Sequence, residues 1–173
     1  MKALVFLAGP LALVWASGLS AAGAGFEVQA DKENVVASRL EGPWRPHAAL
    51  TQRLMGGGPS AQGDSPTGLV AFKSDPSVAG KIPAKYEKPL SGKRVYMAGL
   101  MTLRGKDHPF LLIELRGNPH VVFFREREGD PMGDAESFNV MLAVGKDSPN
   151  DLLFIGGDFN NQPFSAFERS QER

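Results

Sequence analysis

Short blocks of apolar residues recur through the second half of the chain, and clusters of Gly, Pro, Asn and Asp separate them. Each block has the length and composition of a β-strand. The predicted strands are 69–73, 95–103, 109–116, 119–125, 137–145, 151–156 and 164–169. From Val95 onward, each connection is too short to hold a crossover helix. The pattern therefore predicts an all-β fold, an antiparallel meander of consecutive strands.

Several of these strands are apolar on both faces. All four residues from Phe110 to Ile113 are apolar, whereas an antiparallel sheet normally exposes one polar face. The second apolar face therefore needs a cover. The candidates are a helix predicted at 46–55, the long connection at 74–94, and another subunit.

Local signals place the remaining elements. Pro46 suits the first turn of a helix, and a helical pattern follows from His47 to Met55. The glycine-rich residues 56–68 are predicted as a loop, 74–94 as a long surface connection without regular structure, and Glu126 to Glu136 as a polar loop.

The number of strands bears on whether the sheet closes. Seven strands are predicted from Leu69 onward, and the segment before Trp44 is the remaining source of an eighth. Gly117 and Asn118 are predicted as a two-residue hairpin turn. Consecutive hairpins can close into an up-and-down barrel, which removes the exposed edge strands. An open or rolled sheet packed on the helix at 46–55 is the alternative.

Three features resemble the lipocalin/calycin barrels: Gly42-Pro43-Trp44, the hairpin meander, and Arg169 at the end of the last strand. In that superfamily a Gly-x-Trp motif opens the first strand, and an arginine of the last strand packs across the tryptophan at the closed end. The resemblance implies that Trp44 and Arg169 form a structural pair joined by a cation–π contact. It also implies a lipocalin-like barrel whose other end holds a small apolar ligand. Together with the helix predicted at 46–55, this gives an all-β fold with one short N-terminal helix.

Residues 1–24 have the three-part layout of a secretory signal peptide. Lys2 gives a positive start, 3–16 is nearly all apolar, and small residues lead to Ala24. Cleavage near Ala24 leaves 149 of the 173 residues, 25–173, as one domain with no stable membrane span. We therefore predict an exported protein, periplasmic or extracellular.

Charge and composition exclude several classes of function. The chain has 19 basic and 19 acidic residues, scattered along it, so it has no electrostatic footprint for nucleic acid. It contains no cysteine, which excludes disulfides, thiolate catalysis and Cys-ligated zinc. His47, His108 and His120 lack the spacing of metal ligands, and no nucleophile or phosphate-binding motif occurs. We therefore predict no cofactor, no metal and no catalytic residue.

Polar residues within the apolar pattern are the candidates for a ligand site. Asp158, Asn160 and Asn161 lie in the densest polar segment with glycines and offer oxygen donors, although turn chemistry explains the same composition. Asn139 begins the strand before that segment. Glu114 interrupts an apolar strand, so its carboxylate either faces solvent or lines a cavity. The predicted ligand-binding residues are Glu114, Asn139, Asp158, Asn160 and Asn161.

Three hypotheses for the function follow. The first is an exported lipocalin-like binding protein for a small apolar or amphipathic ligand, with a cavity between the sheet faces and a mobile loop at 56–68 near its mouth. The second is a secreted enzyme, a hydrolase or isomerase, using carboxylate or His residues in a cleft. The third is an envelope protein–protein interaction module, whose second apolar face is covered by a partner or by a second copy in a homo-oligomer.

Overall fold

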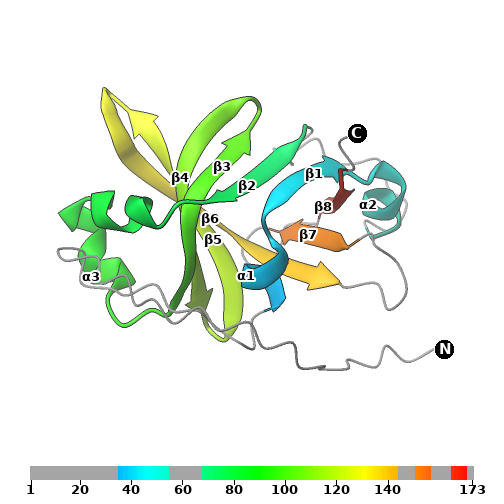
Figure 1. Cartoon of the computed structure of the whole chain (residues 1–173), viewed down its shortest axis with the longest axis horizontal. Helices are drawn as coiled ribbons and strands as arrows, with labels where there is room; N and C mark the ends of the chain where they lie inside the picture. The colour runs from blue at the N-terminus through cyan, green and yellow to red at the C-terminus, as the bar shows by residue number, and fades with distance from the viewer. Residues whose placement is uncertain (1–34, 55–67, 144–150, 157–164, 171–173) are drawn as a thin grey trace.

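The chain forms a closed β-barrel (Figure 1). A computed structural model describes residues 35–54, 68–143, 151–156 and 165–170. Eight antiparallel strands follow one another round the barrel, each beside its neighbours in sequence. They are β1 (Gly42–Pro46), β2 (Val70–Ser74), β3 (Val95–Leu103), β4 (Lys106–Leu115), β5 (Asn118–Arg127), β6 (Asp130–Ala143), β7 (Leu152–Gly156) and β8 (Ser165–Arg169). The predicted all-β antiparallel meander is confirmed.

The barrel closes between the first strand and the last. Trp44 of β1 lies opposite Val70 of β2 on one side and opposite Arg169 of β8 on the other. At the edge of this seam the N–H of Ser170 donates to the carbonyl of Pro43 at 3.0 Å. The eighth strand therefore contains Trp44 and does not precede it. Because β1 pairs with β8, the sheet is a closed barrel, and the alternative of an open or rolled sheet is wrong.

Three consecutive hairpins use the same kind of turn. The turns are Arg104–Gly105, Arg116–Gly117 and Glu128–Gly129, and both residues of each turn have positive φ, from 52° to 81°. This is the conformation of type I′ turns, which match the twist of paired strands. The turn predicted at Gly117–Asn118 is wrong by one residue, because the two positive φ values fall on Arg116 and Gly117.

The β5–β6 hairpin extends well beyond the predicted strands. The polar loop predicted at Glu126 to Glu136 is the end of β5, a turn and the first half of β6. Opposite charges face each other across the two strands: Arg125 lies 2.5 Å from Glu136, and Arg127 lies 3.1 Å from Asp134. The loop prediction is wrong because cross-strand ion pairs support a strand pair without apolar residues.

Apolar side chains form two separate clusters, one inside the barrel and one on its outer wall. The interior cluster takes alternate residues from every strand, together with Val36 and Leu40 that precede β1. Its buried strand residues are Trp44, Val70, Phe72, Met97, Met101, Phe110, Leu112, Val121, Phe123, Val140, Leu142, Leu153, Ile155 and Phe167. The residues between these positions face outward, because side chains alternate along a strand.

The outer cluster lies under residues 75–94, which we call the strap (Figure 1). The strap contains two 3-10 helices, η1 (Pro76–Lys81) and η2 (Ala84–Tyr86), and the one-turn helix α3 (Glu87–Leu90). The residues that meet are Val78, Ala79, Ile82 and Leu90 of the strap and Ala98, Leu111, Ile113, Phe124 and Met132 of the wall. The strap is therefore the cover that the second apolar face needed. The prediction that it lacks regular structure is wrong, because short 3-10 turns leave no amphipathic period in the sequence.

Two short helices flank β1. The predicted helix at 46–55 is confirmed as α2 (Ala48–Leu54), and its Thr51 hydroxyl accepts a hydrogen bond from the N–H of Ala166 in β8 at 2.9 Å. A further helix, α1 (Val35–Arg39), precedes β1. No helix within the described residues is long and apolar enough to cross a membrane. The predicted signal peptide, 1–24, lies outside the described residues.

Candidate functional site

A latch around Trp44 closes the end of the barrel that carries α1, here called the α1 end. The guanidinium of Arg169 lies over the indole ring, 4.4 Å from its centre. Arg169 also donates hydrogen bonds to the carbonyls of Glu41, at 2.6 Å, and Arg39. The indole N–H of Trp44 donates to the carbonyl of Leu40 at 2.8 Å. Trp44 and Arg169, the predicted structural pair, make a cation–π contact here, and we call these contacts the Trp44 latch.

A buried carboxylate extends the latch. Asp151 precedes β7, and its side chain is only 2% exposed. Its oxygens lie 2.8 Å from the guanidinium of Arg39 and 3.5 Å from that of Arg169. The shorter contact is an ion pair by distance, although Oδ1 lacks an aligned hydrogen bond. Because a buried carboxylate is stable only beside such cations, Asp151 joins α1, β7 and β8 at this end.

At the other end, here called the hairpin end, the β3–β4 and β5–β6 hairpins diverge (Figure 1). The pairing of β4 with β5 stops at Phe110 opposite Phe123. Yet β4 begins four residues earlier, at Lys106, and β5 continues to Arg127. The two strands therefore separate and leave a wedge between the hairpins.

Pro109 explains where the two strands separate. The N–H of Glu114 points toward the β3 side of β4, because it donates to the carbonyl of Arg94 at 2.9 Å. Backbone groups alternate sides along a strand, so the nitrogen of residue 109 points toward β5. Proline has no N–H to donate, and the ladder cannot continue there.

The strap holds the β5–β6 hairpin in its diverging position. The pairing of the two strands is irregular near the tip, as in a β-bulge. The hydroxyl of Tyr86 donates to the nearby carbonyls of Met132, at 3.1 Å, and Gly133, at 2.9 Å. The ammonium of Lys85 donates to the same Gly133 carbonyl at 3.1 Å and to the carboxylate of Asp130 at 2.7 Å. These bonds fasten the hairpin to the strap.

The contact between Lys85 and Asp130 changes the pKa of both groups. The hydrogen bond to Asp130 raises the pKa of Lys85 above its ordinary value. The same hydrogen bond, assisted by one from the backbone N–H of Met132, lowers the pKa of Asp130. Both side chains are well exposed, so the pair is screened by solvent and contributes little on its own.

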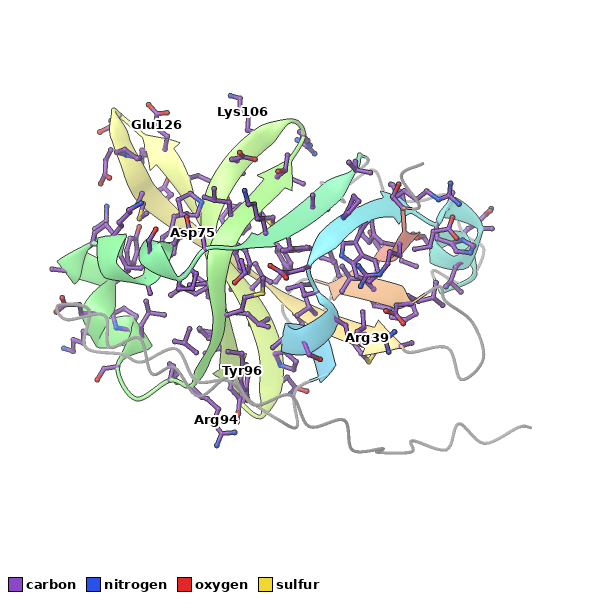
Figure 2. The ribbon with its side chains drawn as sticks, in the orientation of Figure 1. Arg39, Asp75, Arg94, Tyr96, Lys106 and Glu126 are labelled. Carbon is purple, nitrogen blue, oxygen red and sulfur yellow. The ribbon has the colours of Figure 1, made fainter. Side chains whose placement is uncertain are left out.

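The wedge contains a pocket of about 630 Å³, within the size range of small-molecule sites. Figure 2 shows Lys106 and Glu126 near the tips of the two hairpins that flank it. Its lining combines charged with apolar side chains. The lining residues are Leu103, Arg104, Lys106, Asp107, His108, Pro109, Phe124, Arg125, Glu126, Pro131, Asp134 and Glu136.

The wall divides these residues into an inward and an outward side. Lys106 and His108 continue the inward positions of β4, and the ring of His108 packs edge-on against inward Phe123, with 5.8 Å between ring centres. Asp107 lies between them on the outward side, where it accepts a hydrogen bond from Thr102 at 2.6 Å. The inward side of the pocket therefore lies above the aromatic residues of the interior cluster.

Both inward carboxylates of the pocket already have a cation beside them. Glu136 pairs with Arg125, and Asp134 pairs with Arg127. In the described part of the chain, Lys106 has no carboxylate partner. Arg127 lies beside the pocket without lining it. With Arg127 included, the inward side has three cations, Lys106, Arg125 and Arg127, against the two carboxylates.

Glu114, one of the predicted ligand-binding residues, lies away from this pocket. It occupies an inward position of β4 near the α1 end, accepts a hydrogen bond from the hydroxyl of Tyr96, and lies 3.8 Å from the guanidinium of Arg94. Its side chain is about a third exposed. Figure 2 shows Tyr96 and Arg94 at the opposite end of the β3–β4 hairpin from Lys106.

Asn139 lies on the other side of the wall from Glu114. It is buried at an outward position of β6, opposite His120 of β5 and Gly156 of β7. Its Nδ2 has no hydrogen-bond partner among the described residues. The other predicted ligand-binding residues, which lie outside the described part of the chain, are Asp158, Asn160 and Asn161. The structure does not bring Glu114 and Asn139 together, and a ligand-binding role for the five residues stays a prediction.

The residues that line the pocket are absent from the set predicted from the sequence. Two signals point to them once the strands are placed: Pro109 within an apolar strand, and the alternating charges after Phe124. Among the described residues, no group of three or more His, Asp and Glu side chains is close enough to hold a metal ion.

Comparisons with protein-family models, with curated protein sequences and with solved structures found no match for this chain. The fold and the pocket therefore define the class: a closed eight-stranded antiparallel barrel, latched at one end and open to a mixed polar and apolar pocket at the other.

Proposed function

We propose that this protein is an exported, lipocalin-like binding protein that takes a small amphipathic ligand at the hairpin end of its barrel. One observation carries the proposal: the pocket of about 630 Å³ lies between the diverging hairpins, away from the Trp44 latch. A barrel latched at one end and open at the other is a rigid scaffold for a ligand site.

The composition of the pocket favours an amphipathic over a purely apolar ligand. Leu103 and Pro109 supply apolar contact, and Lys106 and Arg125 lie beside them. The interior cluster occupies the barrel below, so the ligand contacts the pocket and not a deep apolar cavity. The apolar part of the ligand then rests on these apolar side chains of the pocket while its polar part meets charged groups.

Native mass spectrometry of the protein, purified from its own cells under mild conditions, tests this proposal. We expect a co-purifying small molecule that is released on unfolding, with a mass below about 500 Da for a pocket of this size. The mass of the polypeptide tests export at the same time, because cleavage near Ala24 yields a chain that begins at Gly25. A bare chain that binds no amphipathic compound contradicts the proposal.

An interaction module is the second candidate, and the unpaired strand edges favour it. Residues 106–109 of β4 and 124–127 of β5 have no strand partner across the wedge. The β5 edge contains no proline and can accept an extended peptide as an added strand. The same mass spectra separate the candidates, because a bound polypeptide or a dimer supports this one and a bound small molecule supports the first.

A further inference from the structure

We propose that the pocket selects ligands that carry a single anionic head group on an apolar body, with the head group beside Lys106 and His108. This inference rests on the proposed function and names the chemistry of its ligand. It follows from the inward side of the wedge, where Lys106 and His108 lie two residues apart on β4 and the ring of His108 packs against Phe123.

The distribution of charge between the two sides determines the sign of the head group. Arg125 compensates Glu136 on the inward side, so the ammonium of Lys106 keeps its charge for a ligand. The outward side is negatively charged, because the carboxylates of Asp107 and Glu126 point there. A ligand on the inward side therefore meets a local excess of positive charge, although the whole chain is neutral.

His108 adds a directional group to that charge. Its ring lies two residues from Lys106 on the same side of β4, and it packs edge-on against Phe123. This packing restrains the ring, while an imidazole N–H remains able to donate to an anionic oxygen. Lys106 and His108 thus offer one charge and one hydrogen-bond donor to the same head group.

The aromatic residues beneath define the place of the apolar body. The rings of Phe123 and Phe138 lie 5.7 Å apart, and both belong to the interior cluster. Leu103 packs against the same cluster and also lines the pocket. An acyl or aryl body contacts Leu103 and the ring of His108, the lining residues that pack on this cluster, while its charged end stays at the mouth, where solvent reaches Lys106.

Three probes with the same twelve-carbon tail test the sign of the head group: dodecanoate, dodecanol and dodecyltrimethylammonium. Their affinities for the purified protein are measured by titration calorimetry below the concentrations at which they form micelles. We expect dodecanoate to bind about fivefold tighter than dodecanol, the effect of one partly exposed ion pair, and the cation to bind weakest. Added salt should reduce the advantage of dodecanoate.

The variant Lys106→Gln should remove the preference for dodecanoate and leave the affinity for dodecanol unchanged. Lys88→Gln, an exposed lysine of α3 that does not line the pocket, is the matched control and should preserve the preference. Circular dichroism of both variants verifies that they fold.

The other outcomes overturn the inference in distinguishable ways. Equal binding of dodecanoate and dodecanol, unaffected by K106Q, contradicts the anionic head group and leaves the proposed function intact. Tightest binding of the cation assigns the head group to the outward carboxylates instead. Failure of all three probes to bind counts against the proposed function itself.

Discussion

At the scale of single residues, Asp151 shows why one carboxylate matters more than many surface charges. Its side chain is 2% exposed and lies between Arg39 and Arg169. We expect Asp151→Asn to lower the free energy of unfolding by about 1–3 kcal/mol, because two guanidinium groups lose their counter-charge while staying partly exposed to water. Urea denaturation of the variant and the parent protein measures the change.

The control for this variant is Glu168→Gln at the same end of the barrel. Glu168 pairs with Arg45 at 2.8 Å, but the side chains are 26% and 61% exposed. Its removal should change the free energy of unfolding by less than about 0.5 kcal/mol. Equal losses in the two variants would contradict a special role for the buried carboxylate.

Gly99 gives a second prediction at this scale. A Cβ atom there would lie 2.0 Å from the carbonyl oxygen of Lys73 in the neighbouring strand. Gly99→Ala should therefore force β2 and β3 apart and lower the free energy of unfolding by about 3 kcal/mol or more. Gly80→Ala, where a Cβ atom meets nothing within 4 Å, should stay within about 0.5 kcal/mol of the parent protein.

At the scale of elements, Pro109 sets the length of the β4–β5 ladder and so the width of the wedge. We expect Pro109→Val to supply the missing N–H, extend the pairing beyond Phe110 and narrow the pocket. The new hydrogen bond stabilises the folded state, whereas loss of the proline gives the unfolded chain more conformational entropy. These effects oppose each other, so the free energy of unfolding should change little. Ligand affinity should fall by about fivefold, the equivalent of 1 kcal/mol.

Amide hydrogen exchange distinguishes this mechanism from a general disturbance. In P109V the amides of Phe124 and Glu126, which face β4, should exchange more slowly, because a strand now lies beside them. Pro89→Val in α3 should leave both the exchange of these amides and ligand affinity unchanged. Faster exchange at 124–127 in P109V would show that the variant disrupts the hairpins instead of joining them.

The sequence predicts some of these elements better than others, for physical reasons. The strands from Val95 onward and the helix at 46–55 were predictable because the spacing of apolar residues within each short segment indicates its secondary structure. The charged hairpin after Phe124 was not, because ion pairs such as Arg127 with Asp134 appear only when two strands are in register. The strap escaped prediction because Val78, Ile82 and Leu90 follow neither a helical nor a strand period.

At the scale of the whole molecule, the ion pair between Lys85 and Asp130 joins the strap to the β5–β6 hairpin. Its contribution to stability depends on pH, because both groups titrate. The lowered pKa of Asp130 means that its contribution is present above the unfolded value of 3.8 and is lost as the pH falls through the folded value. The raised pKa of Lys85 means that its contribution is complete below 10.5 and is lost as the pH rises through the folded value.

A variant without the ammonium tests this link. We expect Lys85→Met to be slightly less stable than the parent protein near neutral pH, and the difference to shrink below about pH 4 and above about pH 10.5. Denaturation at several pH values measures the difference, with Lys88→Met as the control. A difference that persists at pH 3 would assign the effect of K85M to packing or to the lost hydrogen bond to the Gly133 carbonyl, instead of to the ion pair with Asp130.

The same scale explains why the candidate site was harder to predict than the Trp44 latch. Gly42, Trp44 and Arg169 form a short pattern in the sequence, and the contact expected between Trp44 and Arg169 is present in the structure. The pocket arises from three distant causes: the side toward which the nitrogen of Pro109 points, the irregular pairing near the tip of β5–β6, and the bonds from Tyr86. No single stretch of the chain contains that information.

The proline that opens the wedge also affects how copies of the barrel meet in concentrated solution. Strand edges without partners are templates on which other chains add strands and begin to aggregate. The β4 edge of the wedge presents a nitrogen without hydrogen at Pro109, beside the charged residues Lys106 and Asp107. A strand from another molecule finds neither a complete ladder nor an apolar surface there, so the β4 edge stays unpaired and is still a poor seed for fibrils.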